Sequence, residues 1–87
     1  MPDAEQLVRY HLSKILDRDL TGLAPETDLE RDLEVDSLDV AELSAALKGA
    51  GVDVSREEVA AARRYGDLIA LVGTALTGDG AGKGAER

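Results

Sequence analysis

Residues 28–43 read DLERDLEVDSLDVAEL, and this stretch decides the fold that we expect for the whole chain. Asp36 is a suitable helix N-cap, because its carboxylate can accept the unpaired N–H groups of a first turn, and Gly51 is a natural helix end. The pattern therefore predicts a helix over residues 37–50. At about 100° per residue, its core-facing side carries Val40, Leu43, Leu47 and Ala50. Its outer side carries Leu38, Ala41, Glu42, Ala45 and Gly49.

Upstream of this stretch, residues 4–16 have apolar side chains at helical spacing, with Asp3 in position to cap the first turn. They predict an amphipathic helix. The connection over residues 17–35 is long, and Thr21-Gly22 and Pro25 interrupt any regular structure in it. A connection of this length in a small domain needs anchors. We expect four leucines to plug into the core, with a short helical turn near residues 29–33. These leucines are Leu20, Leu23, Leu29 and Leu33.

Downstream, Ser55 and Glu58 form a capping-box pattern that starts a short third helix over residues 56–63. A last helix is predicted over residues 66–76. Its expected buried stripe is Tyr65, Leu68, Ile69, Val72, Ala75 and Leu76. Residues 78–87 read GDGAGKGAER and predict a disordered C-terminal tail after a domain of residues 1–77. The predicted fold class is all-α: a small four-helix bundle with a short third helix and a long loop between helices one and two.

The amino-acid composition excludes several kinds of site and partner. The 87 residues allow one domain, and no cysteine is present for disulfides or thiolate metal sites. His11 is the only histidine, so we expect no metal site. The formal net charge of −8 repels nucleic acid and anionic membranes and favours partners with basic surfaces. With no targeting segment in view, we expect a cytoplasmic protein.

The sharpest chemical feature is Ser37, directly after Asp36 at the start of the predicted second helix. A phosphate attached to a first-turn serine gains from unpaired N–H groups and from the positive end of the helix dipole. Beside it, Leu38, Ala41 and Ala45 form an apolar strip edged by Asp36, Asp39 and Glu42, which suits reversible docking. Taken alone, however, Asp-Ser before a helix is also a common plain N-cap.

The wider stretch resembles the phosphopantetheine attachment region of acyl carrier proteins. The matching positions are Leu29, Asp32-Leu33, Asp36-Ser37-Leu38 and Glu42-Leu43, and Tyr65-Gly66-Asp67-Leu68 resembles the start of the family's last helix. The resemblance covers about residues 3–77, and Met1 favours a discrete protein over a segment of a larger synthase.

This resemblance implies 4'-phosphopantetheine on Ser37, attached by a phosphopantetheinyl transferase, with acyl groups carried as thioesters on its thiol. Asp36 would cap the helix and help the transferase to place its metal ion. Leu38, Asp39, Ala41, Glu42 and Ala45 would form the surface read by a ketosynthase, an acyltransferase and other enzymes. The carrier would make no bonds itself, so it would not be an enzyme and would have no catalytic residue. We expect it to be a monomer.

Several positions depart from the family pattern. Glu34 stands where many members have glycine, Lys48 and Gly49 interrupt an acidic run, and Ala45 replaces a common methionine. Arg64 replaces a frequent capping threonine, so a weaker start of the last helix is expected. These changes favour a polyketide pathway over housekeeping fatty-acid synthesis. Two alternatives stay open: an aminoacyl or peptidyl carrier, and an acidic helical adaptor without a prosthetic group.

Overall fold

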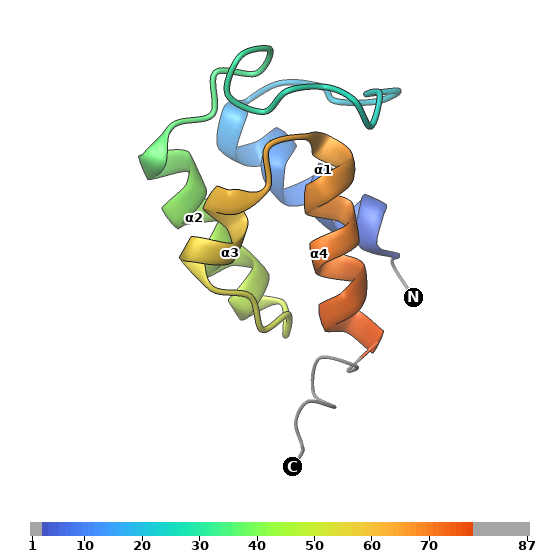
Figure 1. Ribbon diagram of the computed structural model, residues 1–87, viewed down its shortest axis with the longest axis vertical. Coiled ribbons are helices and arrows are strands. Elements are labelled where there is room, and N and C mark those ends of the chain that lie inside the picture. Colours follow the sequence, from blue (N-terminus) through green and yellow to red (C-terminus); the bar gives the residue numbers. More distant parts are fainter. Residues whose placement is uncertain (1–2, 78–87) are drawn as a thin grey trace.

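The computed structural model describes residues 3–77 and contains four helices in that range (Figure 1). They are α1 (Ala4–Leu16), α2 (Ser37–Gly49), α3 (Arg56–Ala61) and α4 (Tyr65–Thr77). Within these residues α1 packs against α2 and α4, and α3 lies between α2 and α4. The predicted all-α bundle, with its short third helix and its long loop between the first two helices, is confirmed. The predicted tail over residues 78–87 lies outside the described residues.

Local capping explains why three of the helices begin where the sequence predicts. Asp3, Asp36 and Ser55 each accept the N–H of the residue three positions later, and that residue's side chain accepts the cap's own N–H. These reciprocal bonds satisfy donors that a helix start otherwise leaves unpaired. The predicted bounds hold to within one residue for α1, α2 and α4, but α3 ends at Ala61 instead of residue 63, because Ala62 is already extended.

The core contains side chains from all four helices and from the first two of the three connecting segments. The long connection contributes as predicted: Leu20, Leu29 and Leu33 are buried, and Leu23 packs against the core from a half-buried position. The predicted turn near residues 29–33 is present as hydrogen-bonded turns, since Asp32 N–H donates to Asp28 O (2.9 Å). The buried core residues are Val8, Leu12, Leu20, Leu29, Leu33, Leu43, Leu47, Val52, Val54, Val59, Tyr65, Leu68 and Val72.

Two expectations about buried positions are wrong, and both concern helix ends. Ala50 is exposed, because it is the C-cap residue at the very end of α2. Leu76 is 43% exposed one residue before the end of α4. Conversely, Ser44 is 6% exposed although it belonged to no predicted core face. Its small side chain fits where a larger polar one would not.

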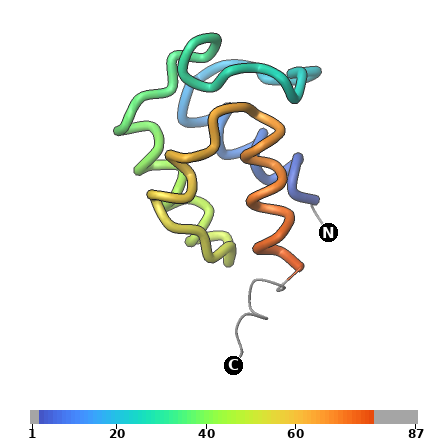
Figure 2. Tube along the Cα trace, in the orientation of Figure 1, coloured from blue at the N-terminus to red at the C-terminus, as the bar shows by residue number. Residues whose placement is uncertain are grey.

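The long connection lies across the end of the bundle where α1 ends and α2 and α4 begin (Figure 2). Its backbone caps α4: Gly66 N–H donates to Pro25 O (2.8 Å) and Tyr65 N–H donates to Thr27 O (2.9 Å). The Asp67 side chain accepts from Arg64 N–H (3.2 Å). The expectation that Arg64 weakens the start of this helix is therefore wrong, because loop carbonyls satisfy the first-turn donors.

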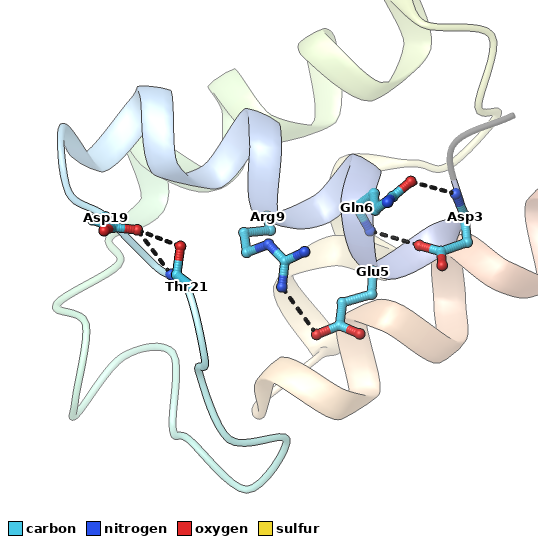
Figure 3. Close-up of polar contacts among 6 residues, drawn as sticks. All are labelled: Asp3, Glu5, Gln6, Arg9, Asp19 and Thr21. Carbon is cyan, nitrogen blue, oxygen red and sulfur yellow. Dashed lines mark hydrogen bonds and ion pairs between the residues drawn. The ribbon is translucent and has the colours of Figure 1, made fainter.

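Polar side chains form local contacts in the N-terminal half of α1 and in the connection just beyond its end (Figure 3). Gln6 N–H donates to Asp3 Oδ1 (2.8 Å), and Arg9 forms an exposed ion pair with Glu5 at 3.3 Å. Beyond the helix, Asp19 Oδ1 accepts from the Thr21 hydroxyl (2.7 Å) and N–H (3.0 Å), which lowers the pKa of Asp19. Exposed pairs of this kind add only about 0.3–0.5 kcal/mol, so the core provides most of the stability.

Candidate functional site

Ser37 is the first residue of α2, and its side chain is exposed. Asp36 holds this helix start: its Oδ1 accepts Asp39 N–H (2.9 Å), while Asp39 Oδ2 accepts Asp36 N–H (3.1 Å). The predicted capping role of Asp36 is thus present. Both carboxylates lie at the positive end of the helix, where they stabilise it and fix the orientation of the first turn.

A pocket of about 360 Å³ opens beside Ser37, between α2, α3 and the long connection. This volume lies at the lower end of the range for small-molecule sites, and the pocket is partly open to solvent. Its walls are partly apolar and combine side chains far apart in sequence. The lining residues are Leu12, Asp28, Leu29, Glu30, Val35, Asp36, Ser37, Val40, Leu43, Val59, Ala60, Ala62, Arg63 and Leu68.

The charged lining of this pocket is mainly acidic. Asp28, Glu30 and Asp36 contribute carboxylates, and Arg63 is the single cationic residue of the lining. A hydrogen bond from Arg31 N–H (2.7 Å) lowers the pKa of Asp28 most, and the Arg31 and Arg63 charges lower it further. At neutral pH the Asp28 carboxylate is therefore ionised at the edge of this partly apolar pocket.

The outer side of α2 presents the predicted apolar strip. Leu38 is 64% exposed, Ala45 is exposed and Ala41 is half-buried. Glu42 is exposed beside them, whereas Asp39 is half-buried because its carboxylate belongs to the capping box. An exposed leucine next to carboxylates at a helix start can contact an apolar spot on a partner while the acids pair with its rim.

The sequence did not reveal the pocket itself. Arg63 is exposed, as arginines commonly are, but it also lines the pocket. Four small residues, Ala46 and Ala60 to Ala62, belong to α2, to α3 and to the C-cap of α3. Of these, Ala60 and Ala62 line the pocket, and Ala46 and Ala61 do not. The signal that places Arg63 there is a backbone contact: Leu29 N–H donates to Arg63 O (2.9 Å).

Residues 3–77 contain neither a metal-binding cluster nor a membrane-spanning helix. No group of three or more His, Cys, Asp and Glu side chains there is arranged to hold a metal ion. None of the helices in this range is long and apolar enough to cross a membrane. Of these residues, Ser37 and its pocket therefore remain the best-formed candidate site.

Comparison with known proteins identifies the family. The family model described as "Phosphopantetheine attachment site" matches residues 6–72, which is most of the chain and includes all the pocket residues. The chain belongs to this family and carries 4'-phosphopantetheine covalently on a serine. It is a phosphopantetheine-dependent carrier that interacts with a phosphopantetheinyl transferase and with enzymes of its pathway. Neither the search of curated proteins nor the search of solved structures returned a match.

Proposed function

We propose that the protein is an acyl carrier that holds acyl intermediates as thioesters on an arm attached to Ser37. One observation supports this assignment above the others: an exposed serine at the first turn of α2 lies at the edge of a partly apolar pocket. A phosphate on Ser37 would meet the positive end of the helix, and a chain beyond it would find apolar walls nearby.

The other described serines have structural roles that speak against attachment. Ser44 is buried between helices and leaves no room for a phosphate. The Ser13 hydroxyl donates to Tyr10 O (3.0 Å) within α1. The Ser55 side chain accepts Glu58 N–H (3.0 Å) and caps α3. Ser37 is the exposed serine in residues 3–77, and its hydroxyl has no such structural bond.

In this proposal Ser37 is an acceptor and not a nucleophilic catalyst. The chain has one histidine, His11, which lies on α1 and does not line the pocket beside Ser37, so Ser37 has no paired base there. Ser37 Oγ would give its proton to a base of the transferase and form a P–O bond to the phosphopantetheine phosphorus of coenzyme A. The diphosphate P–O bond would break, and adenosine 3',5'-bisphosphate would leave. Asp36 keeps the first turn in place and presents a carboxylate that can help to position the transferase's metal ion. Once attached, the arm supplies the thiol that this cysteine-free chain lacks.

The partner surface in this proposal is the outer strip of α2 and its acidic edge. Leu38, Ala41 and Ala45 offer apolar contact, and Asp39 and Glu42 offer charge to basic docking faces. The partners are then a ketosynthase, an acyltransferase and related enzymes, and the carrier acts with them in the cytoplasm as a monomer. It makes no bonds itself.

The carried group belongs to a polyketide or fatty-acid type of pathway, and we favour a polyketide. Ala45 is exposed and small, and Lys48 and Gly49 are exposed at the end of α2, so the strip lacks the bulk and acid run typical of fatty-acid carriers. An aminoacyl or peptidyl carrier is less well supported, because the Gly-Gly typical before its serine is absent at Glu34-Val35.

Intact mass spectrometry tests the proposal directly. The protein is measured before and after incubation with coenzyme A and a broad-specificity phosphopantetheinyl transferase. We expect a gain of one phosphopantetheine, and we expect Ser37→Ala to abolish it. Ser55→Ala serves as the matched control and should still gain the arm.

Two results contradict this assignment. No gain on folded, unmodified protein, with a transferase active on another carrier, favours an acidic adaptor whose Asp36-Ser37 is only a helix cap. A gain that survives Ser37→Ala moves the arm to another serine. An adaptor would also bind its partner equally well with Ser37→Ala, whereas the carrier loses its function.

A further inference from the structure

We propose that Arg63 pairs with the phosphodiester on Ser37 and acts as the positioning residue that holds the arm at the mouth of the pocket. This inference rests on the proposed function, because it needs the arm to be on Ser37. It adds a binding residue from a different part of the chain, the segment between α3 and α4.

Arg63 lies at the same pocket as Ser37, on a backbone segment that is held in place. Arg63 and Ser37 line the same pocket, although 26 positions separate them in the numbering. The backbone of Arg63 is fixed from two sides: its carbonyl accepts Leu29 N–H at 2.9 Å, and the next residue, Arg64, bridges to Asp28. The arginine therefore projects from an anchored segment, which limits the entropy lost when its side chain is ordered.

The charged residues around this pocket are mostly acidic. Three carboxylates, from Asp28, Glu30 and Asp36, line the pocket with Arg63 as the single cation. A phosphodiester on Ser37 adds another negative charge to this acidic rim, and like charges at short range repel. A guanidinium offers two parallel N–H donors that match phosphate oxygens, so it is the group best suited to offset this repulsion.

The Arg63 guanidinium is available to bind a phosphate. Within residues 3–77, neither an ion pair nor a side-chain hydrogen bond engages the Arg63 guanidinium. Arg63 nevertheless lines the pocket together with Asp28, so it belongs to the same rim as the acidic residues. The group is thus positioned near the rim without a fixed partner.

The neighbouring arginine provides a matched control for the experiment. Arg64 is exposed and carries the same charge, but it does not line the pocket. We compare the wild type, Arg63→Gln and Arg64→Gln, each without the arm and with the arm attached, and intact mass establishes loading. The measured quantity is the difference in thermal midpoint between loaded and unloaded protein.

We expect this difference to fall by about 2–4 °C in Arg63→Gln, because an exposed charge pair contributes only modestly to the stability of a small domain. Arg64→Gln should stay within about 1 °C of the wild type. Arm attachment should also shift the Arg63 Nε–Hε NMR signal, and Arg63→Gln should shift the ³¹P signal of the loaded protein.

If the arm is attached successfully, either of two results would overturn the inference about Arg63. Equal effects of Arg63→Gln and Arg64→Gln would mean that net charge alone acts. An effect of Arg63→Gln that appears only when an acyl group is present would mean that Arg63 contacts the carried chain and not the phosphate. Absence of loading in the wild type overturns the proposed function itself, and the mass measurement reveals this before any thermal comparison.

Discussion

Glu34 adopts a left-handed backbone conformation, with φ of 60°, just before the first turn of α2. An L-residue in this region costs about 1–2 kcal/mol, whereas glycine enters it freely but loses more entropy on folding. We therefore expect Glu34→Gly to raise the free energy of unfolding by about 0.5–1 kcal/mol, which raises the thermal midpoint by about 2–8 °C. Thermal unfolding followed by circular dichroism measures this change.

Glu30→Gly is the matched control for that substitution. Glu30 is exposed in the same connection and has no positive φ, so the charge change is identical and no strain is relieved. Glycine there should lower the thermal midpoint. If both variants shift in the same direction, charge and not backbone conformation explains the effect at Glu34. Many family members have glycine at this position, and the positive φ of Glu34 explains why.

Leu38 is the most exposed large apolar side chain among residues 3–77, at 64%. Truncation to Leu38→Ala removes little buried surface, so the thermal midpoint should change by less than about 2 °C. The rate of arm transfer should respond instead: kcat/KM of the transferase should fall about fivefold to tenfold, as for a moderate contact in an interface. Rates of loading followed by mass spectrometry measure this fall.

Tyr10→Ala controls for the loss of an exposed apolar group in general. Tyr10 is 56% exposed but lies on α1, where Lys14 Nζ sits 4.9 Å from its ring centroid. The Tyr10→Ala variant should therefore be loaded with the arm at the wild-type rate. Equal rates for the wild type and Leu38→Ala would remove Leu38 from the docking surface and shift the contact to the acidic edge of α2.

At the scale of elements, the sequence predicted helix starts well wherever the cap is local. Asp3, Asp36 and Ser55 each act within three residues, so a short pattern contains all the information. The start of α4 was harder to predict, because Pro25 and Thr27 provide its cap from about 40 positions away. Helix ends were also harder, since burial at Leu76 depends on how far the neighbouring helices extend.

Gly66 is where the long connection approaches α4 most closely. A Cβ at this position would lie 3.1 Å from Pro25 Cβ and 3.2 Å from Pro25 O, and its N–H donates to the same carbonyl. We expect Gly66→Ala to push this backbone away and to destabilise the fold by about 1–3 kcal/mol. Chemical denaturation measures the free energy of unfolding.

Gly49→Ala tests the same replacement where space is free. A Cβ on Gly49, the last residue of α2, meets nothing within 4 Å. Alanine is the better helix former, so this variant should be stabilised by up to about 0.5–1 kcal/mol. If Gly66→Ala lowers the free energy of unfolding while Gly49→Ala raises it, the backbone is closely packed at Gly66. A gain in stability for Gly66→Ala would show that the loop tolerates displacement there.

At the scale of the whole molecule, the fold class and the position of Ser37 could be predicted, but the pocket could not. Helical periodicity and local caps predicted four helices and the leucines that anchor the long connection. The pocket needs residues 28–30, 35–37 and 59–63 to meet, and no local pattern contains that contact. Arg63 reaches the site through its carbonyl bond to Leu29, which depends on backbone geometry and not on residue type.

The net charge of −8 predicts how partner binding responds to salt. Screening shortens electrostatic range from about 10 Å at 0.1 M to about 3 Å at 1 M. We therefore expect KM of the transferase for this carrier to rise about tenfold between about 50 and 500 mM NaCl. Glu42→Gln should flatten this dependence, while Glu57→Gln, the same charge change on α3, should not. A KM independent of salt would assign docking to Leu38 and Ala41.

The pocket predicts that a carried chain can fold back into the bundle. Its apolar walls come from α1, α2, α3 and α4, so a bound chain would contact all four helices at once. Each buried CH₂ is worth up to about 0.8 kcal/mol, so octanoyl-loaded protein should melt several degrees above protein with the bare arm. Methyl NMR signals of Leu12, Leu43 and Val59 should shift on loading. Those of Val8 and Val72, buried but outside the pocket, should shift little. An equal thermal midpoint with unchanged pocket methyls would mean that the chain stays in solvent, and the pocket would then serve the arm alone.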